Sequence, residues 1–350
     1  MGAERLEVRL AAEADDVRWD RYVRGHALGT VFHLRGWGRA TSDAFGAIQR
    51  DFLAEENGEI VGVLALSACR RVYKPRTWIS APWGVYGDPL GDRSAVAQAL
   101  VEAALEGARA AGVPRLELRC RADPELDGFT ASELYATYTK ELPDDPGEVL
   151  AGYKKNERQY IRRAEEQHGL RFEEGPRFLA ALQRLFLSSK RALGSPGLSG
   201  AWWRALAEHL GEEYTIHAAL KGEDVVAASL TFHNDKEAAM FYIGTTPTAN
   251  REYQATKFMI AKVCEWAVRE GYGVFDLGRS RKGTGAAAFK GHQGFEESGL
   301  HYCYALLDEK AEVPSFNPSN PKTDFARKVW SRLPLWTCEM LTAQVGRYLA

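Results

Sequence analysis

Residues 275–295 read FDLGRSRKGTGAAAFKGHQGF, in which a short strand leads into a basic, glycine-rich loop and then into the pair Phe289-Lys290. No acidic residue stands between Asp276 and Glu296. Glycine lets backbone N–H groups approach an anion closely. The stretch therefore favours a corner that binds an anion or an oxyanion, and a solvated basic loop explains the same spacing equally well. The basic side chains in it are Arg279, Arg281, Lys282 and Lys290.

The two halves of the chain repeat one order of elements. In the first half, Asn57-Gly58 predicts a β-hairpin, because an Asn-Gly pair is the strongest short hairpin signal. Its other expected elements are a strand at 6–10, helices at 16–26, 34–45 and 94–111, and a strand at 115–120. The second half has a helix-rich block, a hairpin, a strand, a helix and a strand at 147–210, 214–233, 238–245, 255–270 and 272–278. This repetition predicts a structural duplication of an α/β unit.

The length of the chain supports two domains, because 350 residues exceed the usual size of a single core. The expected boundary is the acidic, proline-containing segment ELPDDPGE at 141–148. We therefore expect a first domain at 1–145 and a second at 146–310. Residues 311–350 are expected to form a tail, with a loop, VPSFNPSNPKTD, followed by two helices.

The composition excludes several classes of protein. The formal net charge of −2 argues against a polyelectrolyte binder, so any phosphate contact must come from local clusters of charge. Five scattered cysteines without a CxxC pair argue against a disulfide framework and a structural zinc site. The histidines stand singly, and neither a metal-binding nor a Ser/His/Asp constellation is evident. Because no signal peptide or membrane-spanning run is visible, we expect a cytoplasmic protein.

Two further segments could bind a substrate. The helical stretch AGYKKNERQYIRRAEEQHG spaces Lys154, Arg158 and Arg162 on one face. A solvated helix with internal ion pairs accounts for the same charges. The segment SAPWGVYGDPL, which contains Tyr86, carries no charge except Asp88 and suits either a cavity wall or a packed turn.

A familiar cofactor motif is missing. Acetyl-CoA enzymes of the acetyltransferase fold hold the pyrophosphate on an Arg/Gln-x-x-Gly-x-Gly/Ala turn at a helix N-terminus. The corresponding segment here, Arg251 to Thr256, reads REYQAT and lacks both glycines. The segment SRKGTG at 280–285 has the glycine spacing but follows a different strand. This argues against CoA, and we expect no cofactor.

Together these segments resemble the FemAB-related family. FDLGRS followed by a loop and FK is similar to the family's FDxGRS…GxxxFKxxWG signature, and APWGVYGDPL resembles its YGGPL-type segment. KKNERQYIRRAEEQHGL, RALGSP and KVWSRLPL also match family segments, in the family's order and over nearly the whole chain. One departure is His292-Gln293-Gly294-Phe295, which stands where the family often has Trp-Gly after FK. The resemblance implies an α/β fold of two tandem acetyltransferase-like (GNAT) domains, each a mixed central sheet flanked by helices.

The resemblance also implies a reaction. The family's best-known members transfer an amino acid from aminoacyl-tRNA to an amine of a peptidoglycan precursor, so aminoacyl-tRNA is the expected donor. By resemblance, Lys290 stabilises the oxyanion and Phe289 positions it. A lipid-linked precursor would bring the protein to the membrane surface. The expected substrate-binding residues are Tyr86, Lys154, Arg158, Arg162, Arg279 and Ser280.

Two other functions stay open. One is a CoA-dependent N-acyltransferase that acts on a sugar amine or a small metabolite, against which the missing pyrophosphate turn counts. The other is a non-catalytic protein that keeps the fold as a binding scaffold. Decay of the FK pair would be expected of such a scaffold, yet Phe289-Lys290 is intact.

Overall fold

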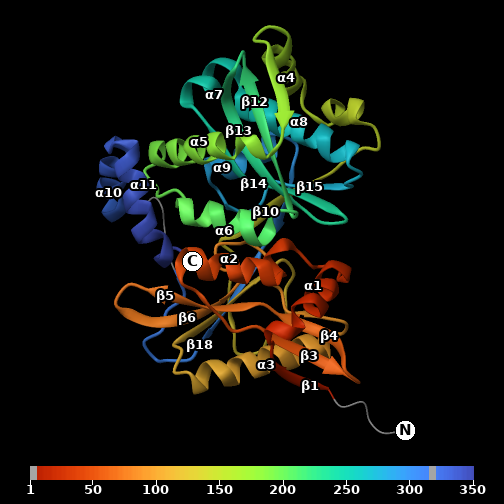
Figure 1. Cartoon of the computed structure of the whole chain (residues 1–350), viewed down its shortest axis with the longest axis vertical. Coiled ribbons are helices and arrows are strands. Elements are labelled where there is room, and N and C mark those ends of the chain that lie inside the picture. Colours follow the sequence, from red (N-terminus) through yellow and green to blue (C-terminus); the bar gives the residue numbers. More distant parts are fainter. Residues whose placement is uncertain (1–5, 315–320) are drawn as a thin grey trace.

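The computed structural model describes residues 6–314 and 321–350 and consists of two α/β units stacked one on the other (Figure 1). The first half of the chain forms the lower unit in this view, and most of the second half forms the upper unit. The expected two-unit α/β architecture is therefore confirmed.

The first unit contains three helices and two sheets. Its helices are α1 (Asp16–Gly25), α2 (Arg35–Phe45) and α3 (Ser94–Ala110), with 3-10 turns η1 (Glu13–Asp15) and η2 (Val31–His33). One sheet has the order β1-β3-β4-β7, from β1 (Glu7–Leu10), β3 (Phe52–Glu56), β4 (Glu59–Leu64) and β7 (Leu90–Gly91). The other has the order β2-β5-β6-β8-β18-β9, from β2 (Ile48–Gln49), β5 (Leu66–Arg71), β6 (Lys74–Ser80), β8 (Arg115–Cys120), β9 (Thr130–Ser132) and β18 (His301–Leu306).

Local sequence accounts for two connections in this unit. Asn57 and Gly58 both have positive φ, as the tight turn between β3 and β4 requires, so the expected hairpin is confirmed. The strands β6 and β8 are parallel, and α3 makes the crossover between them.

The second unit is one large sheet with helices on both faces. The strand order is β11-β12-β13-β14-β15-β10-β16, with β17 also paired to β10. The strands are β10 (Tyr135–Glu141), β11 (Leu170–Glu174), β12 (Tyr214–Lys221), β13 (Asp224–His233), β14 (Glu237–Thr245), β15 (Val274–Asp276), β16 (Ser280–Arg281) and β17 (Glu296–Gly299). The helices are α4 (Lys155–Glu166), α5 (Leu179–Ala192), α6 (Gly200–Leu210), α7 (Pro247–Tyr253), α8 (Ala255–Arg269) and α9 (Gly285–His292), with 3-10 turns η3 (Pro146–Gly152) and η4 (Pro176–Phe178).

One strand in this unit was not expected. The block at 147–210, expected to be helical, also contains β11, which pairs antiparallel with β12 at the edge of the sheet. Gly169 and Gly175, both at positive φ, stand on either side of it and separate it from the neighbouring helices. The strands β14 and β15 are parallel, and α8 connects them.

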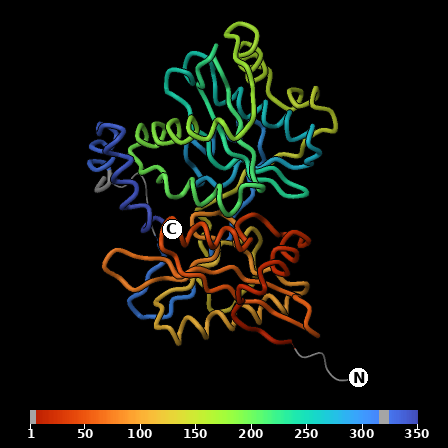
Figure 2. Tube along the Cα trace, viewed as in Figure 1, coloured from red at the N-terminus to blue at the C-terminus, as the bar shows by residue number. Residues whose placement is uncertain are grey.

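The two units exchange strands. β10 precedes the second half of the chain in sequence but pairs with β15 and β17 of the upper sheet. β18 follows the second half and returns to the lower unit, where it lies between β8 and β9. In Figure 2 this return appears as a blue segment among the orange and yellow strands of the lower unit. The domain division that we propose at residues 145 and 310 is therefore crossed by these two strands.

Aromatic side chains from both units share one core at the joint. The Trp37 ring of α2 meets the Trp202 ring of α6 edge to face, with centroids 5.2 Å apart. Phe32 from the first unit meets Phe232 of β13 in the same manner at 6.1 Å. Contacts of this geometry add to the stabilisation from burying the rings. The joint is thus packed like a protein interior, which holds the two units in a fixed relation.

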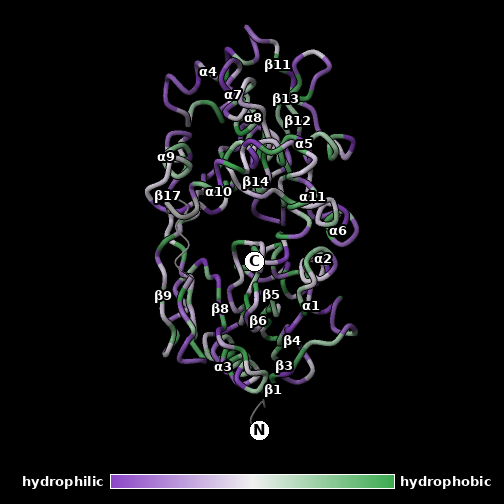
Figure 3. Tube along the Cα trace, turned by 90° about the vertical axis from the view of Figure 1, so that its left-hand side faces the viewer, coloured by the Kyte–Doolittle hydropathy of each residue, from purple (hydrophilic) through white to green (hydrophobic). Residues whose placement is uncertain are grey.

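The C-terminal helices α10 (Pro321–Arg332) and α11 (Leu335–Val345) pack against α5, at the left edge of Figure 1. The 3-10 turn η5 (Gly346–Tyr348) follows them. The two expected tail helices are confirmed, and part of the expected loop, residues 315–320, lies outside the described residues. Within the described ranges, no helix combines the length and the apolar character that crossing a membrane requires. Figure 3 gives the distribution of hydropathy along the trace.

A close approach of α2 to α6 yields a testable prediction. A Cβ atom at Gly36 would lie 2.5 Å from the carbonyl oxygen of His209, so Gly36→Ala must push the two helices apart. We expect a loss of about 1–3 kcal/mol in the free energy of unfolding, measured by urea denaturation. Gly25→Ala is the matched control, since a Cβ there meets nothing within 4 Å. Equal stability of the two variants would contradict the tight joint.

Candidate active site

The basic loop after β15 is closed by a lysine from the following helix. Thr284 caps α9, and its hydroxyl accepts a hydrogen bond from the backbone N–H of Ala287. Lys290 on this helix reaches back to the loop. Its ammonium group donates to the carbonyl oxygens of Leu277, Gly278 and Arg279, at 2.6, 2.8 and 3.3 Å. The corner predicted from the sequence is therefore built around one cation.

The surroundings of Lys290 lower its pKa. Burial lowers the pKa of Lys290 to about 8, the Asp276 carboxylate acts in the opposite direction, and the Arg279 guanidinium acts in the same direction as burial. The Tyr138 ring also lies 5.2 Å from Nζ. Lys290 is thus a cation at neutral pH that can lose its proton at a modest cost.

A buried carboxylate holds the loop in place. Asp276 is 0% exposed, and its Oδ1 accepts hydrogen bonds from the backbone N–H of Gly278 at 2.6 Å and the hydroxyl of Thr137 at 3.0 Å. Its Oδ2 accepts from the Tyr86 hydroxyl at 2.5 Å. Tyr86 belongs to the first unit, so this contact joins the two units directly beside Lys290.

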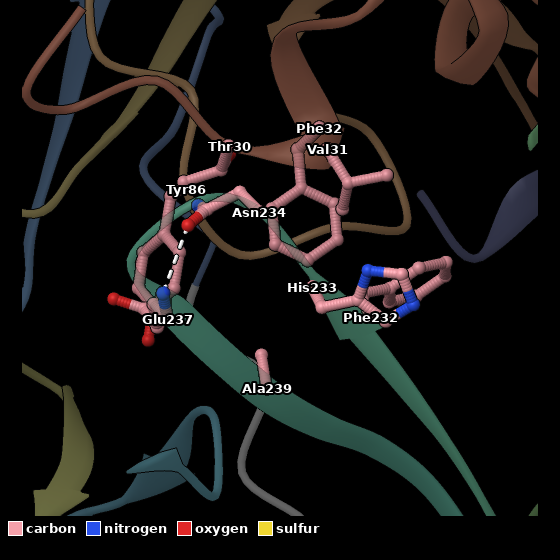
Figure 4. Close-up of a pocket in the computed structure, with 9 residues that line it drawn as sticks. All are labelled: Thr30, Val31, Phe32, Tyr86, Phe232, His233, Asn234, Glu237 and Ala239. Carbon is pink, nitrogen blue, oxygen red and sulfur yellow. Dashed lines mark hydrogen bonds between the residues drawn. The ribbon is translucent and has the colours of Figure 1, made fainter. Parts of the chain in front are cut away.

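An ion pair between Arg121 of the first unit and Glu237 of the second also connects the two units. The Arg121 guanidinium lies 3.9 Å from the centroid of the Tyr86 ring and donates to both carboxylate oxygens of Glu237, at 3.0 and 3.1 Å. Figure 4 shows Tyr86, Thr30 and Phe32 of the first unit and Glu237 of the second unit around a narrow cavity. The cavity has a volume of about 20 Å³ and is also lined by Val31, Phe232, His233, Asn234 and Ala239.

The other residues predicted for this corner lie as follows. Ser280 is buried in β16, opposite Ala136 of β10. Arg279 is exposed, lies over the Tyr135 ring at 4.7 Å and donates to the Tyr302 hydroxyl at 2.9 Å. Phe289 is half-buried against the core of the second unit. The structure therefore brings Tyr86, Arg279, Ser280, Phe289 and Lys290 into one region.

The basic helix is a separate surface. Lys154 and Arg162 are exposed, and Arg158 donates to the carbonyl oxygen of Ala151 at 3.2 Å. Among residues 6–314 and 321–350, none of these three side chains hydrogen-bonds to the loop around Lys290. The same helix is nevertheless tied to α9 from its buried side, through Glu157.

Sequence reasoning missed this tie. Glu157 accepts a hydrogen bond from the Gln293 amide at 2.6 Å and pairs with Lys257 at 3.0 Å. The Lys140 ammonium donates to the carbonyl oxygen of Gln293 at 2.6 Å. Gln293 belongs to the four residues that depart from the family pattern, and that departure was the available signal. Asp276 was also missed, although it is the one acidic residue in the FDLGRS motif.

Residues 251–256, which were compared above with the glycine turn of CoA enzymes, lie at the end of α7 and the start of α8. Gln254 takes the left-handed conformation at φ 53°, a conformation that glycine adopts more easily. The Asn250 side chain accepts from the backbone N–H of Thr256 at 3.3 Å, so one N–H group of the helix start is already used. The expectation that a CoA diphosphate lacks its usual binding turn here stays a prediction.

The electrostatics of the corner give a testable prediction. The Asp276 charge raises the pKa of Lys290, so Asp276→Asn should lower it below the wild-type value of about 8. Competitive labelling with acetic anhydride, read by mass spectrometry across a pH series, measures the pH at which Lys290 becomes reactive. Asp127→Asn, at an exposed site of the first unit, should leave that pH unchanged. A Lys290 that titrates at or above its wild-type pH in Asp276→Asn would show that the carboxylate does not act on it.

Comparisons with known proteins identify the fold. Residues 151–291 match the family model described as Acetyltransferase (GNAT) domain. A search of curated proteins found no relative. The crystal structure of FemX superposes with a TM-score of 0.69 at 14% identity, over 85% of this chain and 96% of that chain.

Two further structures resemble the chain at similar identity. The C-terminal DUF2156 domain of a protein described as a lysylphosphatidylglycerol synthetase, from Agrobacterium fabrum, has a TM-score of 0.58 at 16% identity, over 84% of this chain and 93% of that chain. A tandem GNAT protein from the clavulanic acid biosynthesis pathway has a TM-score of 0.51 at 12% identity, over 88% and 100%. These structures and the domain match show that the chain has the acetyltransferase fold, with an Acetyltransferase (GNAT) domain matched at residues 151–291.

Proposed function

We propose that this protein is an N-acyltransferase that moves an aminoacyl group from aminoacyl-tRNA to an amine of a peptidoglycan precursor. The observation that carries the proposal is the half-buried ammonium group of Lys290, held against three carbonyl oxygens beside the joint of the two units. A preorganised cation in such a place suits a reaction that develops negative charge on an oxygen atom.

In the proposed reaction, the acceptor amine attacks the carbonyl carbon of the donor ester. A C–N bond forms, and the C–O bond to the ribose then breaks. In the tetrahedral intermediate the former carbonyl oxygen is negatively charged, and Lys290 stabilises it. All three N–H groups of Lys290 already have partners, so the oxyanion replaces the longest bond, to Arg279. The amine nitrogen loses a proton and the leaving ribose oxygen gains one, either directly or through a water molecule.

The other predicted residues have supporting roles in this proposal. Phe289 packs against the core and fixes the turn of α9 that carries Lys290. Tyr86 presents its ring to the narrow cavity between the units, and Ser280 lies at the start of the basic loop. Arg279 is exposed and can meet an anionic group of the substrate. Lys154, Arg158 and Arg162 offer a basic face to the phosphates of tRNA.

The choice of aminoacyl-tRNA rests on two features. At the glycine-free start of α8 the N–H group of Thr256 already donates to the Asn250 side chain, which counts against binding of a CoA diphosphate there. In addition, one similar fold belongs to a protein whose name links it to lysylphosphatidylglycerol, an aminoacylated product. A CoA-dependent N-acyltransferase is the second candidate. The likeness to the tandem GNAT protein and the basic residues between Arg279 and Lys290 favour it.

The experiment that tests the function is a transfer assay. Labelled aminoacyl-tRNAs and acyl-CoAs are offered with a panel of peptidoglycan precursors, and amide formation is followed by mass spectrometry. We expect transfer from aminoacyl-tRNA and binding of acetyl-CoA no tighter than about millimolar. Lys290→Met should lower turnover roughly a hundred- to a thousand-fold. Lys282→Met, an exposed lysine in the same loop, is the matched control.

Two results would contradict the proposal. Transfer from acetyl-CoA with micromolar binding would replace the tRNA donor by CoA. Near-normal turnover in a Lys290→Met protein whose circular dichroism matches the wild type would remove Lys290 from the mechanism. Because Lys290 also binds the loop, the circular dichroism comparison is part of the measurement.

The basic helix supports a separate prediction. Reversing Arg158 and Arg162 to Glu should raise the Michaelis constant for tRNA about tenfold and flatten its dependence on salt, with kcat little changed. The charge-matched control is Lys155→Glu with Arg163→Glu, which alters a neighbouring face of the same helix. Equal effects of the two double variants would mean that net charge, and not this face, matters.

A further inference from the structure

A second, larger cavity lies entirely in the first unit, away from the Lys290 loop. Its volume is about 350 Å³, and it lies between the end of α1, the segment before α3, the first turns of α3 and the loop after β8. The residues that line it are His26, Leu28, Asp88, Pro89, Gly91, Ser94, Ala97, Gln98, Ala122, Asp123, Pro124, Glu125 and Leu126. The proposed acyl transfer leaves this cavity without a role.

The lining carries only one sign of formal charge. Asp88, Asp123 and Glu125 contribute three carboxyl groups, and none of the lining residues is a lysine or an arginine. The start of α3 opens on the cavity and, with Arg93 at its N-cap, has no side-chain cap. A helix start normally attracts anions. The carboxylates around this one disfavour a ligand with several negative charges, such as a diphosphate.

Asp88 provides the decisive observation. It is 4% exposed, and its Oδ1 accepts hydrogen bonds from the backbone N–H groups of Arg121 and Ala122, at 2.8 and 3.4 Å. Its Oδ2 is buried and has no hydrogen-bond partner among the described residues. A buried charge that lacks a partner is unfavourable. Asp88 therefore favours a cation in the cavity that it lines.

Among the described residues, no cationic side chain donates a hydrogen bond to the Asp88 carboxylate. The Arg121 guanidinium is near enough for its charge to lower the pKa of Asp88, but its own two hydrogen bonds go to Glu237. Burial raises the pKa of Asp88 to about 6, so at pH 7 the group is still largely ionised. The Nε2–H group of His33 donates to the Asp88 carbonyl oxygen, not to the carboxylate.

A metal ion does not fit the arrangement. Within the described residues, one group brings three or more possible ligand atoms within 4.8 Å of one another, and it is Asp43, Glu208 and His209, none of which lines this cavity. The carboxyl groups of the cavity are thus too dispersed for one small ion. An organic ammonium group with an attached chain fits better, because Leu28, Pro89 and Leu126 line the remaining wall with apolar surface.

We propose that this cavity binds a primary ammonium group on an aliphatic chain, with Asp88 as its buried counter-charge and Glu125 at its rim. If the proposed function holds, the ligand is the acceptor, held by an ammonium group that does not react. The amine that attacks the ester must be neutral. Such an acceptor would therefore carry two amines, one bound as an ammonium ion beside Asp88 and one that reacts near Lys290. The inference on binding does not depend on the reaction.

Calorimetric titration with 1,5-diaminopentane tests the proposal. We expect a dissociation constant of about millimolar or tighter, weakened at least about tenfold by Asp88→Asn, since the buried counter-charge is lost. Glu125→Gln, at an exposed rim position, should weaken binding about two- to fivefold. The control Asp127→Asn should bind as the wild type does. Lys290→Met should also bind normally, which separates this proposal from the proposed reaction.

Three outcomes would overturn the inference. The first is no binding of 1,5-diaminopentane at ten millimolar by the wild-type protein. The second is unchanged binding in both Asp88→Asn and Glu125→Gln, where Glu125→Gln decides alone if Asp88→Asn does not fold. The third is inorganic phosphate binding more tightly than the diamine, which would make the start of α3 an anion site.

Discussion

The structure depends on one buried carboxylate. Asp276 accepts hydrogen bonds from Tyr86 of the first unit, from Thr137 on the exchanged strand β10, and from the backbone of its own loop at Gly278. A buried charge is tolerated only when its partners are in place. The three donors must therefore stay together, and the orientation of the loop carbonyls toward Lys290 follows from that. The hydrogen bonds of Asp276 therefore fix both the placement of the two units and the geometry of the loop around Lys290.

The order of local patterns was enough to predict two α/β units, most helices and both hairpins. The partners of those elements were not predictable in the same way. Tyr86 and Asp276 are 190 residues apart, and no local pattern connects them. The strands β10 and β18 have the ordinary composition of strands, so nothing in their residues tells which sheet they join. β11 was missed for a related reason, since a five-residue edge strand between two helices leaves little periodicity to detect.

At the site, the sequence identified the right loop but not its internal bonds. Lys290 was expected as a cation facing the substrate, and the short helix α9 instead directs it back to three carbonyl groups. Residues 292–295 depart from the family's Trp-Gly. In the structure, Gln293 is buried and links α9 to Glu157 on the basic helix. The departure from the family pattern at Gln293 is therefore part of a buried contact between α9 and the basic helix.

The exchange of β10 and β18 bears on how the chain is made. During synthesis the lower sheet cannot be finished until residue 306 has left the ribosome, because β18 lies between β8 and β9. By then the whole of the upper sheet has emerged, since β17 ends at residue 299. The N-terminal unit, although first to appear, has to wait with an open edge at β8. Nascent chains with such an edge are exposed to wrong pairing, so the interval between residues 120 and 301 is the period in which this protein most needs protection.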